Sequence, residues 1–175
     1  MRTIQIVPWQ KEWQDYFYHE RKLLELEAGS PGDHIYHIGS TSIPGLAAKP
    51  VIDILIETPE LSLWTEDRLE GIGYTGKGEH GIEGRAFYYK GEHVRRFHVH
   101  VFEKESEGSG RHLAFRDYLR SFPAKAEEYE IIKKQAAERH PHSPSEYMNE
   151  KHAVVQKLEQ EAICWKRTEE EADDF

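Results

Sequence analysis

The sequence has one cysteine, no long apolar run and fewer basic than acidic residues, and each shortage excludes a class of protein. Cys164 cannot form an internal disulfide, so the chain lacks the cross-links of small secreted proteins. No apolar run approaches the roughly 20 residues that cross a bilayer, and the first residues lack a signal-peptide core. A net charge of −9 argues against a broad nucleic-acid-binding face. We expect a cytoplasmic protein that binds neither membrane nor nucleic acid.

The length and composition favour a single folded domain. The chain has 175 residues, of which 38% are hydrophobic and 11% aromatic, which suffices for a substantial core. It contains no internal repeat and no linker rich in Pro, Gly or Ser. We therefore predict one domain over residues 1–167. Residues 168–175 form an acidic tail that we expect to be disordered.

Apolar periodicity and turn residues predict the order of the elements. Helices are expected over residues 9–28, 62–72, 111–122, 123–139 and 144–166, and strands at residues 35–38, 51–56, 85–89 and 94–102. The last two strands should form an antiparallel hairpin, and residues 104–110 a solvated loop. This order predicts an α+β fold, in which helices pack on a small mixed sheet and the C-terminal half is helical.

The stretch HIGSTSIPGLAAKPVIDILIE, residues 37–57, contains the residue that most needs an explanation. Residues 39–50 are small, hydroxylic and interrupted by Gly and Pro, which predicts a loop with a single helical turn. Residues 51–56 form a β-branched apolar run, which predicts a strand buried on both faces. Asp53 interrupts that run. A buried carboxylate is costly unless it is paired, hydrogen-bonded or bound to a metal, so Asp53 is the first candidate site residue.

The turn formed by Gly39, Ser40, Thr41 and Ser42 is a candidate phosphate-binding segment. A Gly-Ser pair at a strand end offers backbone N–H groups and hydroxyls to an anion. The alternative is a tight loop whose hydroxyls bond their own backbone. Because Asp53 follows shortly afterwards, we expect the turn to bind phosphate.

His98 and His100 are candidate metal ligands together with Asp53. Residues two apart on a strand share a face, so the two imidazoles should point the same way. Mg²⁺ prefers oxygen ligands, whereas imidazole favours ions such as Zn²⁺ and Mn²⁺, so the divalent ion stays open among Mg, Mn and Zn. The alternative is that the histidines face solvent and that Asp53 bonds Lys49 or a backbone amide.

Three basic residues are candidates to face the same cleft. Lys49 shortly precedes Asp53, Arg85 opens the predicted hairpin, and Arg116 lies one helical turn before Arg120. Their alternative role is ion pairing with the many acidic residues. We select Lys49, Arg85 and Arg116 as candidate phosphate ligands.

These residues resemble those of the GrpB family, which belongs to the nucleotidyltransferase superfamily. The superfamily signature is an apolar residue and Gly-Ser, a spacer, and then a strand with Asp, an apolar residue and a second carboxylate. Ile38-Gly39-Ser40 matches the first part and Asp53-Ile54 the second, but Leu55 stands in place of the second carboxylate. The resemblance extends to IVPW, HVHV and HLAFRDYLR, and thus spans nearly the whole chain.

The resemblance implies metal-dependent transfer of a nucleotidyl group from a nucleoside triphosphate to an unknown small acceptor, with Asp53 as the catalytic residue. Leu55 cannot bridge two cations, which favours an alternative, a non-catalytic module that binds a nucleotide or a coenzyme A precursor. The coenzyme A link is implied because GrpB-like domains occur joined to dephospho-CoA kinase. In either case the expected partner is a nucleotide or another phosphorylated small molecule. The oligomeric state stays open.

Overall fold

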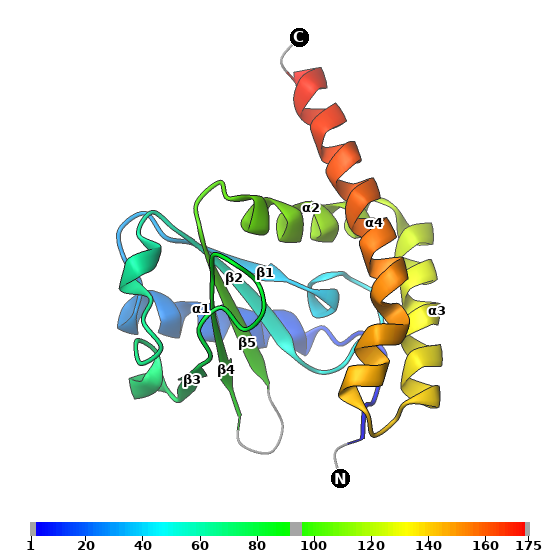
Figure 1. Ribbon diagram of the computed structural model, residues 1–175, viewed down its shortest axis with the longest axis horizontal. Coiled ribbons are helices and arrows are strands. Elements are labelled where there is room, and N and C mark those ends of the chain that lie inside the picture. Colours follow the sequence, from blue (N-terminus) through cyan, green and yellow to red (C-terminus); the bar gives the residue numbers. More distant parts are fainter. Residues whose placement is uncertain (1–2, 92–95, 174–175) are drawn as a thin grey trace.

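The computed structural model describes residues 3–91 and 96–173, and these form one five-stranded sheet and four α-helices (Figure 1). The strands are β1 (His34–Ile38), β2 (Ile52–Thr58), β3 (Tyr74–Gly76), β4 (Arg85–Lys90) and β5 (Phe97–Glu103). The helices are α1 (Glu12–Glu27), α2 (Glu107–Ser121), α3 (Pro123–Arg139) and α4 (Pro144–Asp173). The predicted α+β class with a helical C-terminal half is confirmed.

The sheet has the strand order β1-β2-β5-β4-β3, in which β2 and β5 run parallel and the other neighbours run antiparallel. The antiparallel pairing of β4 with β5 confirms the predicted hairpin, although its predicted residues 94 and 95 lie outside the described part of the chain. Asp53 lies opposite His98 in the parallel register, and Leu55 lies opposite His100. The two central strands therefore bring the candidate residues together near their N-terminal ends.

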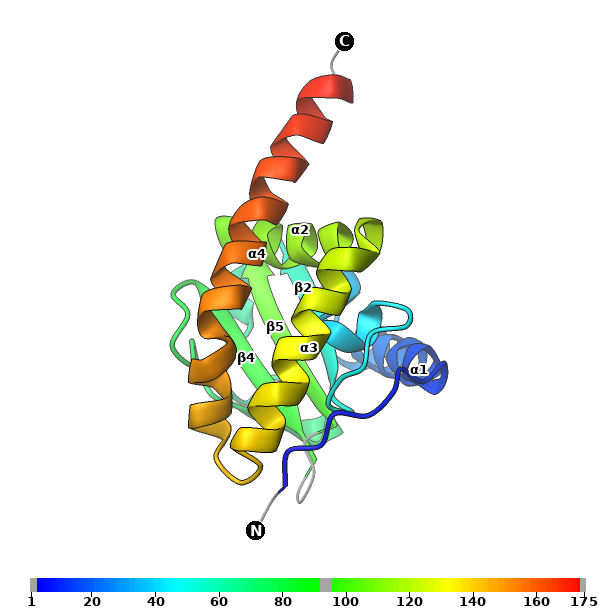
Figure 2. The same cartoon turned by 90° about the vertical axis from the view of Figure 1, so that its right-hand side faces the viewer.

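Helices cover both faces of the sheet. On one face Trp13, Phe17 and Leu24 of α1 pack against the apolar side of β2, as their helical spacing predicts. Full burial of such side chains stabilises the fold by about 1.5–3 kcal/mol each. On the other face Leu55 packs beneath α2. In Figure 2 helices α3 and α4 lie in front of the sheet, and they form a second core with α2 and residues 43–46.

The predicted helix over residues 62–72 is wrong. Within it the structure has two 3-10 turns, Leu61–Leu63 and Glu70–Ile72. The carbonyl of Thr65 accepts a hydrogen bond from the hydroxyl of Tyr88 at 2.6 Å, and the hydroxyl of Thr65 donates to Asp67 at 2.6 Å. These bonds compete with the ladder of a continuous helix.

Three helices also differ from their predicted bounds, and the first of them, α1, begins at Glu12 and not at residue 9. Helix α2 begins at Glu107, because Ser106 accepts a hydrogen bond from the backbone N–H of Ser109 and caps the helix. Helix α4 continues to Asp173, through most of the acidic segment that we expected to be disordered. Glutamate has a good helix propensity, and adding residues to a formed helix is far easier than starting one.

Candidate functional site

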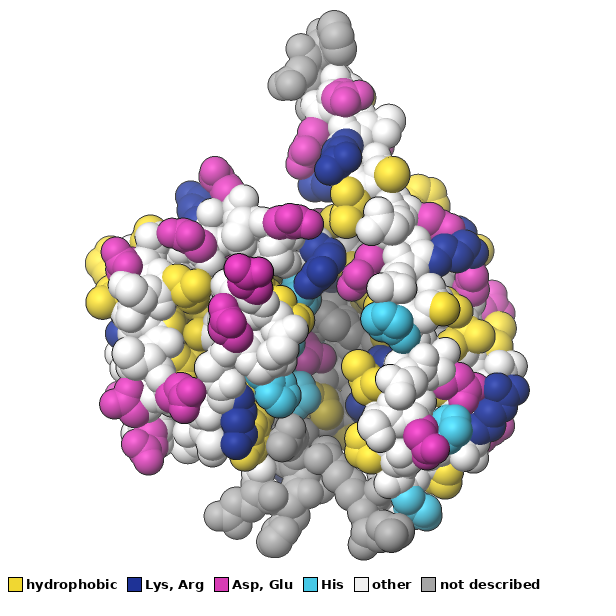
Figure 3. Space-filling view, in the orientation of Figure 1, with side chains coloured by type: hydrophobic (Ala, Val, Ile, Leu, Met, Phe, Trp, Pro, Cys, Tyr) yellow, Lys and Arg dark blue, Asp and Glu magenta, His cyan; other side chains and the backbone are white. Residues whose placement is uncertain are grey.

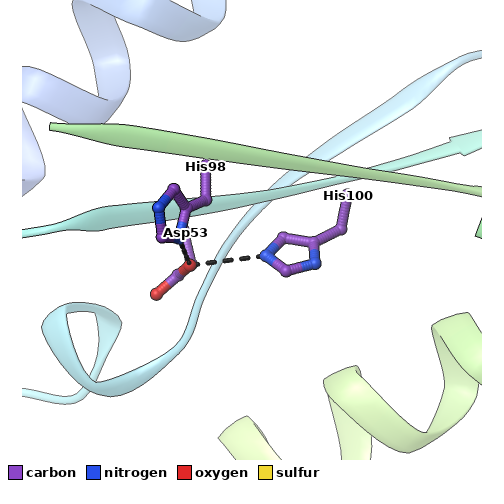
Figure 4. A group of neighbouring side chains, drawn as sticks. All are labelled: Asp53, His98 and His100. Atoms are coloured by element: carbon purple, nitrogen blue, oxygen red, sulfur yellow. Dashed lines mark hydrogen bonds and ion pairs between the residues drawn. The ribbon is translucent and has the colours of Figure 1, made fainter. Parts of the chain in front are cut away.

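The carboxylate of Asp53 lies between the imidazoles of His98 and His100 (Figure 4). Its Oδ1 is 3.3 Å from Nδ1 of His98 and 3.3 Å from Nε2 of His100. One ligand atom from each of the three residues lies within 4.8 Å of the others. The structure thus brings together the three residues that the sequence selected as metal ligands.

The protonation of His100 follows from its second contact. Its Nδ1 lies 3.2 Å from Nη1 of Arg85, and a guanidinium can only donate, so this nitrogen is the acceptor. Burial lowers the pKa of His100 below its ordinary value, which keeps the imidazole neutral at pH 7. The single proton of the ring is therefore on Nε2, where it is donated to Asp53.

The ionised form of Asp53 is stabilised by its neighbours. Burial alone would raise the pKa of this carboxyl, but the hydrogen bonds from His100 and His98 hold it well below its usual range. Asp53 is consequently a carboxylate at neutral pH, although its strand is otherwise apolar. The predicted cost of a carboxylate in this strand is offset here by imidazole N–H groups.

Gly39 packs directly against Asp53. Its φ of +71° and ψ of −177° lie in a region that is essentially restricted to glycine. A Cβ at this position would lie 2.5 Å from Oδ2 of Asp53. The glycine therefore allows the turn to approach the carboxylate closely.

Two hydroxyls of the turn bond within the protein. Thr41 donates to the carbonyl of Val51 at 3.1 Å and so accepts from Nε2 of His37 at 3.0 Å. Ser42 donates to the carbonyl of Gly39 at 2.7 Å, and both hydroxyl residues are buried. These bonds match the alternative of a self-bonded loop, and they leave Ser40 as the turn hydroxyl better placed for a ligand, since Ser40 lines the adjacent cavity.

A cavity of about 260 Å³ opens beside the turn and Asp53. Gly39, Ser40 and Thr41 line one side of it with Asp53 and His98, and residues of α3 and α4 line the other side. The space-filling view shows the surface hollowed between the sheet and the C-terminal helices, with histidine, basic and acidic side chains around the hollow (Figure 3).

Three lysines reach this cavity, namely Lys49, Lys133 and Lys151. Lys49 was selected from the sequence, whereas Lys133 and Lys151 were not. Each of these two follows a tyrosine by four residues on its helix, Tyr129 on α3 and Tyr147 on α4, and residues at that spacing share a helix face. This Tyr-x-x-x-Lys spacing is the signal in the sequence that could have identified them.

The two selected arginines do not line this cavity. Arg85 is 7% exposed, and besides His100 it donates to the carbonyls of Glu79 and His80. Arg116 donates to Asp117 and to the carbonyl of His37 on another side of the turn. The structure does not bring Arg116 to Asp53, because its helix face points to the outer side of β1.

No second carboxylate joins Asp53 in the described part of the chain. Leu55 is 0% exposed and packs with Ile38 and Phe102. Glu57, which shares the same strand face, accepts a hydrogen bond from the hydroxyl of Ser109 at 2.7 Å. Glu57 is thereby held at the N-terminal end of α2.

Asp53 and His98 fit a divalent cation better than His100 does. Nδ1 of His98 faces Asp53 at 3.3 Å, and Nε2 of the same ring is buried with no hydrogen-bond partner among the described residues, so the ring proton can move to Nε2 and leave Nδ1 to a cation. Ligation through Nε2 of His100 requires its proton to move to Nδ1, which faces the guanidinium of Arg85. The usual partner of that second nitrogen is an acceptor and not a cation.

The fold and the cleft define a class: a mixed α+β protein that groups Asp53, His98 and His100 on neighbouring strands, with Asp53 and His98 lining a cavity that three lysines also line. The sequence model described as "GrpB protein" matches residues 3–161, and the chain belongs to the GrpB family. Among the helices of the described residues, none combines the length and the hydropathy that a bilayer-spanning segment needs.

Related proteins agree with this assignment. The UPF0157 protein YqkA of Bacillus subtilis is 41% identical over 95% of the chain, which spans 49% of that protein. The glutamate-rich protein GrpB of Alkalihalophilus pseudofirmus is 34% identical, over 87% of this chain and 92% of that one. The crystal structure of conserved protein GrpB from Enterococcus faecalis superposes with a TM-score of 0.86 at 38% identity, covering 93% of this chain and 99% of that one.

Proposed function

We propose that the cleft binds a phosphorylated small molecule, with a nucleoside triphosphate as the candidate, together with a divalent metal ion. The observation that carries this proposal is the cavity, where the Gly39–Thr41 turn and Asp53 face three lysines. In a chain of net charge −9 such a local gathering of cations favours an anionic ligand. The carboxylate among them is suited to a cation that the phosphates share.

Asp53 and His98 would hold the metal, and the mixed oxygen and imidazole donors favour Mn²⁺ or Zn²⁺ over Mg²⁺. When bound, such an ion neutralises phosphate charge and polarises a phosphoryl oxygen. The chain's own residues would supply the remaining contacts. Ser40 and the lysines would bind phosphate oxygens, and Arg85 would keep His100 turned toward Asp53.

Nucleotidyl transfer to a small acceptor is the second candidate function, and the pair of Asp53 and His98, as the proposed metal ligands, favours it. In that reaction a hydroxyl of the acceptor attacks the α-phosphorus and pyrophosphate leaves. The burial of Leu55 and the engagement of Glu57 with Ser109 favour binding without transfer, because two-metal chemistry uses more than one carboxylate. A coenzyme A precursor would satisfy the same phosphate contacts in a binding module.

The test is thermal unfolding with ATP and Mn²⁺. A ligand at 100 times its Kd stabilises the native state by about 2.7 kcal/mol. We expect ATP with Mn²⁺ to raise the Tm of the wild type, and Asp53→Asn to lose the part of the shift that requires the metal. Asp15→Asn, an exposed carboxylate on α1, is the matched control and should retain the full shift. An equal shift in D53N would place the metal elsewhere, and no shift in the wild type would refute the proposal.

Transfer is tested in the same preparations with ATP labelled at the α-phosphate and a small-molecule extract. A labelled product formed by the wild type and absent with D53N would support catalysis. Binding without any labelled product would favour the binding module.

A further inference from the structure

We propose that Lys133 and Lys151 form a subsite for two linked phosphates, as in pyrophosphate, at the side of the cleft made by α3 and α4. This inference rests on the proposed binding of a phosphorylated ligand, and it specifies where the terminal phosphates lie. The ligand class is a pyrophosphate group, either free or as part of a nucleoside triphosphate.

The two lysines are held by aromatic rings on adjacent helices. Nζ of Lys133 lies 4.7 Å from the ring centroid of Tyr129, and Nζ of Lys151 lies 5.0 Å from that of Tyr147. Nζ of Lys151 also lies 5.8 Å from the ring of Tyr129, so one tyrosine contacts both ammonium groups. The rings fix the lysines toward the cavity without neutralising their charge.

Lys133 is a buried lysine that has no ion-pair partner among the described residues. Its side chain is 2% exposed, and its Nζ donates to the carbonyl of Ala47 at 2.5 Å. Within residues 3–91 and 96–173, no carboxylate forms an ion pair with Lys133 or Lys151, whereas Lys134 and Lys157 both form such pairs. A buried ammonium is costly unless it is paired, so a bound anion would supply the missing counter-charge.

The size of the cavity favours a phosphate chain over a whole nucleotide. Its volume of about 260 Å³ is below the range of about 300–1,000 Å³ that is typical of pockets for drug-sized ligands. Lys49 lines the same cavity, near the ring of Tyr147 at 4.8 Å. A pyrophosphate would therefore meet ammonium groups from the loop before β2 and from both helices.

The environment of Lys133 couples binding to a proton. Burial lowers its pKa to about 7, and the charges of Lys151 and Lys49 act in the same direction. On its own helix Glu130 raises the pKa and Lys134 lowers it. An anion beside Nζ favours the protonated form, so binding above pH 7 should take up a proton at Lys133.

The test measures binding of sodium pyrophosphate in the presence of a chelator, by calorimetry and by the shift in Tm. We expect Lys133→Met and Lys151→Met each to weaken binding at least about tenfold, because each removes a charge-assisted hydrogen bond to the anion. The control Lys157→Met removes an exposed lysine of α4 that pairs with Glu128 and Glu161, and it should bind like the wild type. Wild-type affinity in both folded variants, K133M and K151M, would overturn the proposal.

Further measurements test whether the lysines contact linked phosphates in particular. AMP lacks the linked phosphates, so its affinity should be equal in wild type and K151M, while ATP should lose affinity as pyrophosphate does. Proton uptake at pH 7.5, from calorimetry in two buffers, should be smaller for K133M than for the wild type. If K133M does not fold, K151M with the AMP and ATP comparison decides.

The test of the lysine subsite can be separated from the test of the metal site. The pyrophosphate titrations are made in chelator and need no metal ion, so failure of the proposed metal site would leave them unchanged. Retained lysine-dependent binding of pyrophosphate, together with a wild type that shows no additional shift in Tm with Mn²⁺, would refute the metal site and leave the lysine subsite standing.

Discussion

Replacement of Gly39 by alanine tests how closely the turn fits the carboxylate of Asp53. The new Cβ would lie 2.5 Å from Oδ2, and the backbone at φ +71° and ψ −177° is strained for any residue with a side chain. The strain costs about 1–3 kcal/mol, and displacing Asp53 from its two imidazoles costs a further 1–3 kcal/mol, roughly. We expect G39A to lower the free energy of unfolding by about 2–6 kcal/mol.

Gly45 provides the matched control for this substitution. It also has a positive φ, +83°, but no atom lies within 4 Å of the position of its Cβ. Gly45→Ala should therefore show backbone strain alone, about 1–2 kcal/mol. Urea denaturation of both variants at pH 7 measures the difference, which combines the contact with Asp53 and any difference in backbone strain between the two positions. Equal losses in the two variants would refute the close fit. The G39A protein should also bind Mn²⁺ more weakly, while G45A should bind it as the wild type does.

Two further predictions concern the histidines. Burial lowers the pKa of His37 to about 4, so the unfolded chain binds more protons below pH 6.5 and the native state loses stability as the pH falls toward 4. His37→Phe should make the loss between pH 7 and pH 4.5 smaller by about 2 kcal/mol in urea denaturation, and an unchanged slope would contradict this origin. Arg85→Met should tighten Zn²⁺ binding several-fold, as measured by calorimetry. Without Arg85 the proton on Nε2 of His100 could move to Nδ1, which would leave Nε2 to bind the ion. Weaker binding in the folded variant would show that His100 does not become a zinc ligand.

The site on the central strands could be predicted because the alternation of side chains along a strand determines which residues share a face. The alternation of His98 and His100 places both on one face, and a β-branched run with one carboxylate identifies Asp53 as the exception in a buried strand. Pairing β2 with β5 then brings the three side chains together. The predicted bounds of α3 also match, since Pro123 begins that helix and Arg139 ends it.

The cavity could not be predicted, because it depends on how α3 and α4 pack against the sheet. Lys133 occupies a buried position in its helix, between Tyr129 and Ala136, and helical periodicity alone does not reveal what faces a buried lysine. Helix packing also explains why Arg116 lies outside the cleft, although the sequence predicted that it faces the cleft. Its shared face with Arg120 was correctly inferred, but that face meets the carbonyls of His37 and Ser42 and so supports the turn from outside the cleft.

The start of α2 was missed because a glycine in a sequence can indicate either a loop or a close packing contact within a helix. Gly108 and Gly110 favoured a loop by propensity, since each weakens a helix by about 1 kcal/mol relative to alanine. In the structure a Cβ on Gly108 would lie 2.4 Å from the ring of Phe102, so this glycine serves the packing of α2 on β5. The helix is retained because Ser106 caps it and because Ser109 bonds Glu57.

The bond between Ser109 and Glu57 also bears on the choice between catalysis and binding. Glu57 is the nearest strand carboxylate that could have replaced the one missing at Leu55, yet α2 holds it in a buried bond of 2.7 Å. Arg85 meanwhile donates to His100, which disfavours that imidazole as a ligand. Both contacts reduce the number of side chains available as ligands to metal ions, while in the proposed site the three lysines would increase the affinity for phosphate. The balance of charge in the cleft therefore favours tight binding of a phosphate chain with one cation over chemistry that needs two.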